Sequence, residues 1–200
     1  SRPTYQGSNP FSDIGSKTAI QIGGTQLVKA VNEHENYEAR HQLMFAATLA
    51  GQAFGNAGVH VPHAMSYSVA GLNHNYIAKG YESASPMIPH GISVVLNAPA
   101  AFRFTGRANP ERHFQAANAL GADTTNVRIN DGGEILAKRL IEMMQITGLP
   151  NGLRGVGYCK EDIPALVKGG YAQSRLLAQA PCPISEEDLA GIYLDAMTYW

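Results

Sequence analysis

The residues best suited to chemistry are four histidines within residues 55–96, namely His60, His63, His74 and His90. Neutral imidazole nitrogen is a good ligand for iron, zinc and nickel, and it binds a cation without adding charge. His60 and His63 are three positions apart, so a helix would place them on one face. His90 follows a proline and must return to His63 by folding. Spacing alone leaves open whether His63 and His90 share a metal or are surface or hydrogen-bonded residues.

The other histidines give weaker signals. His34, His41 and His113 lie in charged or polar helical segments, and we expect all three to face solvent. His74 is expected at the edge of a loop.

The cysteines and several arginines are interpreted as structural. Cys159 and Cys182 lack the spacing of a CxxC pair, so small buried residues are favoured over nucleophiles. Arg103, Arg107 and Arg112 could meet a carboxylate substrate, although a solvated helix face is the favoured interpretation.

Composition indicates one globular domain with a substantial core. Of the 200 residues, 44% are hydrophobic and 16% are charged, and the formal net charge is −1. No basic block is present, so nucleic acid is not an expected partner. No apolar run approaches the ~18 residues of a membrane span. The chain also lacks a Gly-rich phosphate loop, a signal-peptide pattern and an initiator methionine, and we expect a fragment or a processed piece.

Helix signals dominate the chain, whereas alternating strand patterns are few. Helices are predicted over 10–31 after the cap Asn9 and weakened at 23–24, from a cap at Asn36 to 55, over 60–76, over 91–105, over 110–121, from 130 or 131 to 148, from 162 to 169–170, and after the cap Ser185. The second helix is expected to bury one face through Leu43, Met44, Ala47, Ala50 and Phe54. Residues 80–89 are predicted to be a loop. The fold class is therefore an all-α bundle.

Several motifs, in the same order, resemble a known family. The segments GNAGVHVPHAMSYSVAG, IPHGISVVLNAPAAF and PERHFQAANALGAD resemble the C-terminal helical domain of iron-containing alcohol dehydrogenases, which has a dehydroquinate synthase-like fold. The later segment YCKEDIPALVKGGYAQSRLLAQAPCPISEEDLAGIY is also similar. The resemblance covers nearly the whole chain and is greatest to the hydroxyacid–oxoacid transhydrogenase branch.

The resemblance implies a metal site. In this family one Asp and three His hold a divalent metal, between the helical domain and an N-terminal dinucleotide-binding domain. By motif, His63 matches the third ligand and His90 the fourth. The first two ligands form an Asp-x-x-x-His pair that has no counterpart before residue 60, since Asp13 is followed by Lys17. We therefore expect residues 1–200 to be a single helical metal-binding domain that lacks the N-terminal domain.

Tyr67 departs from the pattern of many family members. They carry another histidine four residues after the third ligand, near the nicotinamide, whereas this chain has Tyr67, as the transhydrogenase branch does. The resemblance thus implies Tyr67 as a catalytic residue beside the cofactor.

The resemblance also implies a function. The full enzyme would hold Fe²⁺ or Zn²⁺, bind NAD mainly through its N-terminal domain, and transfer hydride between 4-hydroxybutyrate and 2-oxoglutarate. The isolated chain should be inactive, bind metal weakly and bind no NAD tightly. Substrate carboxylates call for a positive group in the cleft, which the sequence does not identify.

Two alternatives remain open. One is an NAD(P)-dependent dehydrogenase of the same family, of the 4-hydroxybutyrate or maleylacetate reductase type. The other is a non-catalytic helical interaction module, and self-association into a homo-oligomer is compatible with all three functions. A bacterial protein would be cytoplasmic and a eukaryotic one would lie in the mitochondrial matrix.

Overall fold

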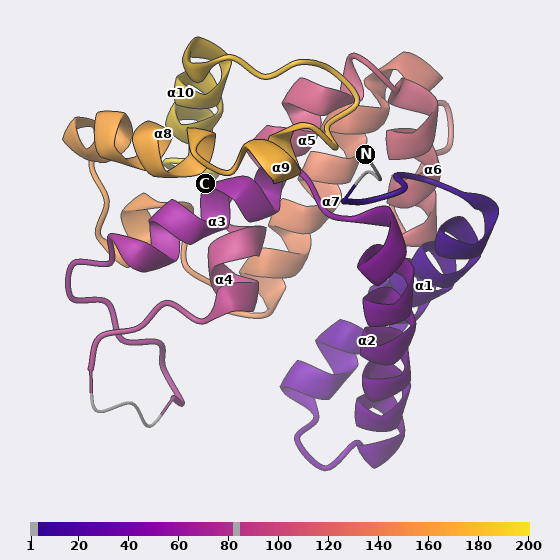
Figure 1. Ribbon diagram of the computed structural model, residues 1–200. Helices are drawn as coiled ribbons and strands as arrows, with labels where there is room; N and C mark the ends of the chain where they lie inside the picture. Colours follow the sequence, from indigo (N-terminus) through magenta and orange to yellow (C-terminus); the bar gives the residue numbers. More distant parts are fainter. Residues whose placement is uncertain (1–3, 82–84) are drawn as a thin grey trace.

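The regular elements of residues 4–81 and 85–200, which the computed structural model describes, are helices, with one isolated bridge between Ile77 and Met87 (Figure 1). They are α1 (Pro10–Asn32), α2 (Tyr37–Ala57), α3 (Val61–Gly71), α4 (His90–Val95), α5 (Ala98–Gly106), α6 (Pro110–Ala119), α7 (Gly132–Ile146), α8 (Ile163–Tyr171), α9 (Ser174–Leu177) and α10 (Glu186–Asp195), with 3₁₀ turns at Ile129–Asp131, Arg154–Val156 and Lys160–Asp162. The all-α prediction is confirmed. Residues 1–3, at the N-terminus, and 82–84, in the predicted loop 80–89, lie outside the described residues. None of the helices in the described ranges is long and apolar enough to cross a membrane.

Helix α1 begins where the sequence predicts. The side chain of Asn9 accepts a hydrogen bond from the backbone N–H of Ser12, and the Ser12 hydroxyl accepts one from the N–H of Asn9. This reciprocal pair satisfies two donors that a helix start would otherwise leave free. Pro10 costs no hydrogen bond at the first helical position, because a backbone N–H there would have no acceptor within the helix.

One glycine of the pair in α1, Gly24, lies at a close helix contact. The helix continues through Gly23 and Gly24 to Asn32 without interruption. The predicted weakening concerns helix stability and stays a prediction. A Cβ at Gly24 would lie 2.6 Å from the backbone oxygen of Leu120, at the end of α6. The absent side chain lets α1 and the end of α6 approach at backbone distance.

Helices α1 and α2 form a hairpin that projects from the rest of the molecule (Figure 1). The face that α2 buries is formed by Ala39, Ala46 and Ala53, and not by the larger residues that the sequence predicts. Met44 and Phe54 stay 70% and 48% exposed. Small side chains occupy the buried face because α1 and α2 approach closely. A Cβ at Gly15 of α1 would lie 3.3 Å from the Cβ of Ala53.

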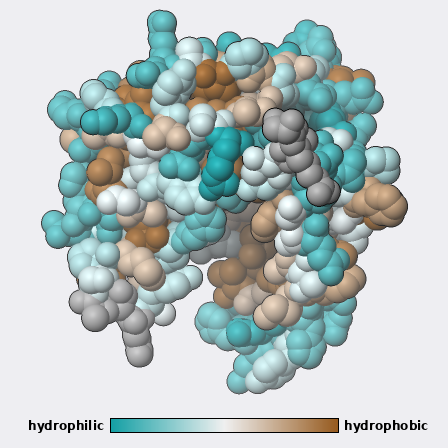
Figure 2. All heavy atoms as spheres, viewed as in Figure 1, coloured by the Kyte–Doolittle hydropathy of each residue, from teal (hydrophilic) through white to brown (hydrophobic). Residues whose placement is uncertain are grey.

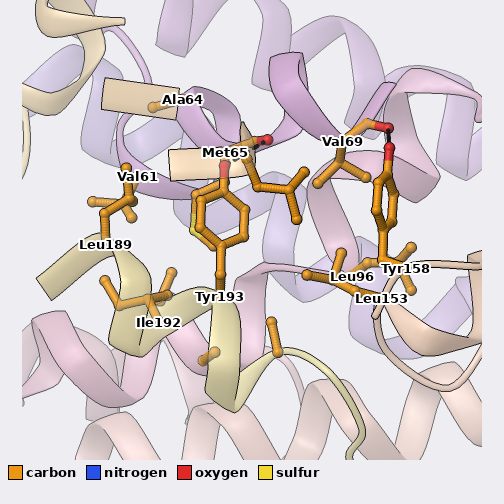
Figure 3. Close-up of a cluster of buried hydrophobic side chains, with 14 of the residues drawn as sticks. Val61, Ala64, Met65, Val69, Leu96, Leu153, Tyr158, Leu189, Ile192 and Tyr193 are labelled. Carbon is orange, nitrogen blue, oxygen red and sulfur yellow. Dashed lines mark hydrogen bonds between the residues drawn. The ribbon is translucent and has the colours of Figure 1, made fainter. Parts of the chain in front are cut away.

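The main core surrounds α3, which the C-terminal helices cover (Figure 3). The buried hydroxyl of Tyr193, on α10, lies 2.7 Å from the Oγ of Ser68, and the Tyr158 hydroxyl donates to the carbonyl of Val69 at 2.6 Å. Each bond satisfies a polar group that would be costly to bury alone. A Cβ at Gly169 would lie 2.7 Å from that of Ser68, so α8 also packs closely on α3.

The predicted helix 91–105 is two helices. Helix α4 ends at Val95 and α5 begins at Ala98, with a turn at Leu96–Asn97. Pro99 accounts for the break, since it has no N–H to donate and its ring would clash with the carbonyl four residues earlier. Helix α3 is likewise shorter than the predicted 60–76, and α8 continues past the predicted stop at 169–170 to Tyr171.

The glycine pair gives a matched test of this packing. Gly24→Ala should lower the free energy of unfolding by about 1–3 kcal/mol, because its methyl group would collide with backbone. Gly23→Ala should instead raise it by about 0.5–1 kcal/mol, since nothing lies within 4 Å of its Cβ and alanine favours the helix. Urea unfolding followed by far-UV circular dichroism measures both. Equal changes in the two variants would contradict the close contact at Gly24.

Candidate metal centre

His63 lies in the first turn of α3, on the side of that helix that the core leaves uncovered. The neighbouring residues Val61, Ala64 and Met65 are fully buried, which fixes how the helix is rotated. The hydroxyl of Ser66 donates to the His63 carbonyl at 2.8 Å and strengthens this first turn. The His63 ring is therefore carried by a rigid element.

His90 is the first residue of α4. Ile88 and Pro89, just before it, are buried, and the Ser93 hydroxyl donates to the His90 carbonyl at 2.8 Å. The rings of His63 and His90 lie with their centroids 5.5 Å apart at an angle of 58°. The structure thus brings together the two histidines that the motifs predict as metal ligands.

These rings line a cleft of about 220 Å³ whose walls come from separate parts of the chain. The lining residues are Tyr5, Phe54, Gly58, Val59, His63, Tyr67, His90, Arg175 and Leu176. On the molecular surface, a hollow separates the α1–α2 hairpin from the rest of the molecule, and apolar residues gather on its hairpin side (Figure 2).

Burial prepares His63 to act as a ligand. Removal of solvent lowers the pKa of His63 below its usual value, and the neighbouring His90 lowers it further. Both effects disfavour the protonated ring, because a buried charge loses hydration and two imidazolium ions repel. His63 therefore offers a neutral nitrogen near pH 7, the form that a metal requires.

Tyr67 lies one helical turn after His63 on the same side of α3. Its ring centroid is 6.5 Å from that of His90, and its hydroxyl accepts a long hydrogen bond of 3.5 Å from Arg175. The side chain is 47% exposed. Tyr67 thus borders the histidine pair and is partly open to solvent.

The donor set fits part of a transition-metal site. Two imidazoles within ring contact suit iron or zinc, whereas a complete site usually needs at least three protein ligands. Across residues 4–81 and 85–200, no group of three or more His, Cys, Asp or Glu residues comes together as a metal site would require. His63 and His90 could hold a divalent metal only with ligands from elsewhere.

His60 does not join this pair. Its ring packs edge-on against Phe102 at 5.9 Å and lines a separate cavity of about 480 Å³, together with His113. Burial lowers the pKa of His60 to about 4, with smaller contributions from His113 and His63. His60 is the residue before α3 and lines a different cavity from His63, so the two histidines do not belong to one site.

His113 corrects another prediction. It is buried rather than exposed to solvent, its Nδ1 lies 2.8 Å from the carbonyl of Asn109, and its Nε2 lies 2.9 Å from the Thr105 hydroxyl. Because a carbonyl only accepts, Nδ1 donates to Asn109, while the Thr105 hydroxyl beside Nε2 also donates to the carbonyl of Ala101 at 2.9 Å. His34 and His41 are exposed as predicted. His74 lies in the irregular segment after α3, 3.2 Å from Asp162.

Neither cysteine lines the cleft of the histidine pair. Cys159 is exposed and Cys182 half-buried, which corrects the prediction of two buried cysteines. Hydrogen bonds to Glu161 and Asp162 raise the pKa of the Cys159 thiol, which makes it a poor nucleophile.

The three arginines that the sequence raised as candidates also lie outside the cleft. Arg103 pairs with Glu134 and Asp195, and Arg112 pairs with Asp13, while Arg107 is exposed at the end of α5. These pairs support the structural interpretation.

A family model, "Fe-containing alcohol dehydrogenase family, C-terminal", matches residues 4–197. The chain belongs to the iron-containing alcohol dehydrogenase family. Human mitochondrial hydroxyacid-oxoacid transhydrogenase is 49% identical over 196 residues, which make up 98% of this chain and 42% of that protein. The chain thus spans about two fifths of that relative's length.

Solved structures of iron-containing alcohol dehydrogenases share the fold. A 1,3-propanediol oxidoreductase superposes with a TM-score of 0.83 at 26% identity, over 96% of this chain and 46% of the other. The sulfoacetaldehyde reductase of Bifidobacterium kashiwanohense, solved with NAD⁺, gives a TM-score of 0.76 at 22% identity, over 97% of this chain and 46% of the other. The helical architecture is therefore the C-terminal domain of this family.

Burial of His113 predicts a pH dependence of stability. Desolvation lowers the pKa of His113, whereas the unfolded chain keeps the ordinary value. Between these values the unfolded state binds more protons, so the free energy of unfolding should fall as the pH drops from 7.5 to 5. Urea unfolding at several pH values measures this slope, which His113→Gln should reduce but not abolish, since His60 contributes with the same sign. The control His34→Gln, at an exposed position, should keep the original slope, and an identical slope in both variants would contradict the assignment.

Proposed function

We propose that this chain is the metal-binding helical domain of an iron-dependent oxidoreductase that passes hydride from 4-hydroxybutyrate to 2-oxoglutarate through bound NAD. The observation that carries the proposal is the contact between His63 and His90, whose rings lie 5.5 Å apart in the cleft. The sequence identity to a hydroxyacid-oxoacid transhydrogenase supports the choice of substrates.

His63 and His90 would hold the metal as two of its four protein ligands. The other two, an Asp and a His, are expected on a helix upstream of residue 1, because no third candidate ligand joins the pair within the described residues. With a metal held by these residues, the site would have a Lewis acid for the substrate oxygen. The contribution of this chain is to present two imidazole nitrogens from rigid helix starts.

Residues 1–200 would form one domain of a two-domain protein. The chain covers 42% of the human relative, and the remaining length leaves room for a dinucleotide-binding domain. That domain would supply most of the NAD site, because this chain shows no phosphate-binding loop. The sulfoacetaldehyde reductase that shares the fold was solved with NAD⁺, which supports NAD as the cofactor.

Tyr67 is proposed as a catalytic residue at the edge of the cofactor. Its ring lies beside that of His90, and its hydroxyl accepts a hydrogen bond from Arg175. Here it can orient the substrate and exclude water from the reacting carbon. It has no role as a metal ligand in this proposal.

We infer the cell compartment from the relatives. The human relative is named as mitochondrial, so we place a eukaryotic protein of this sequence in the mitochondrial matrix and a bacterial one in the cytoplasm. The exposed apolar residues of the α1–α2 hairpin, Phe11, Met44 and Phe45 among them, are compatible with a covering domain or a second subunit.

The metal assignment predicts the behaviour of two variants. In the full-length protein, His63→Ala and His90→Ala should each lower bound iron and reduce the rate by orders of magnitude, since each removes a direct ligand. Metal content by plasma mass spectrometry and the initial rate are measured together. His74→Ala, outside the cleft, is the matched control and should keep its iron. Full iron occupancy in both cleft variants would refute the shared site.

The fate of the hydride tests the reaction itself. The full-length protein should convert deuterated 4-hydroxybutyrate, labelled at its carbinol carbon, and 2-oxoglutarate into succinate semialdehyde and 2-hydroxyglutarate without added NAD. One deuterium should appear at carbon 2 of 2-hydroxyglutarate, because the bound cofactor carries the hydride from one substrate to the other. Mass spectrometry detects it. Turnover that requires free NAD and no oxo acid would instead support an ordinary dehydrogenase.

A further inference from the structure

Arg175 places a positive charge in the same cleft as the two histidines. It lies on α9, and its guanidinium donates a 3.0 Å hydrogen bond to the Tyr5 hydroxyl and a 3.5 Å one to the Tyr67 hydroxyl. Both acceptors are neutral. The cation is held by polar contacts that leave its charge uncompensated.

The other arginines of the described residues fall into two groups: Arg40, Arg107 and Arg154 form no ion pair, as Arg175 does not, and the rest do. Four of them, namely Arg103, Arg112, Arg128 and Arg139, form ion pairs with Asp or Glu. Arg175 has no carboxylate within 4.0 Å among the residues that the structure describes. An unpaired guanidinium in a cleft is suited to bind an anion that arrives from solution.

The surroundings hold Arg175 in place. The next residues of α9, Leu176 and Leu177, are buried in the core. Its partner Tyr5 lies flat against Gly58, where a Cβ would come 2.7 Å from the tyrosine ring. Gly58 also has a φ of +83°, a conformation that favours glycine. The chain therefore builds this contact from both sides, which limits the motion of the guanidinium.

Donor capacity remains for a ligand. A guanidinium has five N–H donors, and the two tyrosine contacts occupy one each on Nη1 and Nη2. The remaining donors can bind both oxygens of a carboxylate, the geometry that arginine forms best.

The proposed substrates present such a carboxylate at the same place. In 4-hydroxybutyrate the reacting carbon is followed by two methylenes and a carboxylate. In 2-oxoglutarate the reacting carbon is also followed by two methylenes and a carboxylate, and its second carboxylate lies on the other side. One cation at a fixed separation from the metal ligands can therefore orient both substrates.

We propose that Arg175 is the anchor for this shared carboxylate, an inference that rests on the proposed function. Tyr67 contacts both the His90 ring and Arg175, so the anion site and the metal ligands lie one side chain apart. This short separation suits a reacting carbon and a carboxylate joined by two methylenes. Arg175 thereby selects hydroxy acids over simple alcohols.

The test uses the full-length, iron-loaded enzyme and two readouts. Calorimetry with glutarate, which keeps the carboxylates of 2-oxoglutarate but cannot react, measures anion binding. Turnover of 4-hydroxybutyrate is compared with that of 4-hydroxybutyramide, its uncharged analogue. Variants are Arg175→Met, Arg175→Gln and Arg175→Lys. The control Arg40→Met removes an exposed arginine of α2, 14 residues and roughly 21 Å of helix from Phe54 at the cleft.

We expect Arg175→Met and Arg175→Gln to weaken glutarate binding by about 10- to 100-fold, the range for loss of a charge-assisted hydrogen-bond pair. The preference of the enzyme for 4-hydroxybutyrate over the amide should fall by a similar factor. Arg175→Lys should recover part of both losses, and Arg40→Met should change neither. A purely structural role would lower both turnovers equally and leave their ratio unchanged.

The outcomes separate the two claims. A wild type that does not exchange hydride between the two acids refutes the proposed function, and Arg175 is then judged by glutarate alone. Weaker glutarate binding in the variants supports the anchor, whereas unchanged binding, or no binding to the wild type, overturns it. If Arg175→Met loses its iron, the comparison rests on Arg175→Gln and Arg175→Lys.

Discussion

The burial of α3 is the constraint on which the rest of the site depends. Most of this helix is covered, and its buried residues are Val61, Pro62, Ala64, Met65, Ser66, Ser68 and Val69. His63 and Tyr67, four positions apart, lie on the stripe that remains uncovered, because residues at this spacing share a face. Any rotation of α3 would bury these two side chains and expose the core. Core packing therefore sets the direction of the candidate ligand and of the tyrosine beside it.

The second ligand depends on the same core through a different route. His90 is 27 positions from His63 in the sequence, and the chain between them leaves the core and returns. The buried Ile88 anchors the return, and Leu96 anchors the far end of α4. The break before Pro99 then separates α4 from α5, so α4 can take an orientation different from that of α5. The two histidine rings meet because buried residues fix the first turn of α3 and the first turn of α4.

Local signals made the helix starts predictable, whereas tertiary contacts decided the rest. The caps Asn9, Asn36 and Ser185 use their side chains as the sequence predicts, because capping involves only residues within one turn. The buried face of α2 was not predictable, since hydrophobicity favours Met44 over the alanines that the close approach of α1 selects. His113 was misplaced for a similar reason, as its burial depends on a bond to Thr105 in another helix.

The candidate site shows the same division. His63 and His90 were found because motifs carry them, and their proximity is a property of the fold. Arg175 was not found although it lies in the later segment that resembles the family, because the resemblance assigns it no role and its contact Tyr67 is 108 positions away. Only the folded chain shows that its charge is unpaired and faces the histidines. A single sequence does not show which charged residues will lack a partner of opposite charge in the folded chain.

The charges of the cleft explain why this domain would need another to function. Among the described residues, the cleft holds two imidazoles and a positive arginine but no carboxylate, so this part of the chain offers no negative ligand to offset a divalent metal. Two neutral ligands beside a cation hold such a metal weakly, because charge repulsion opposes binding. In the proposed enzyme, an upstream aspartate and the substrate carboxylate supply the missing negative charge. The metal and the acid substrate then each favour the binding of the other, and this domain orients both without retaining either alone.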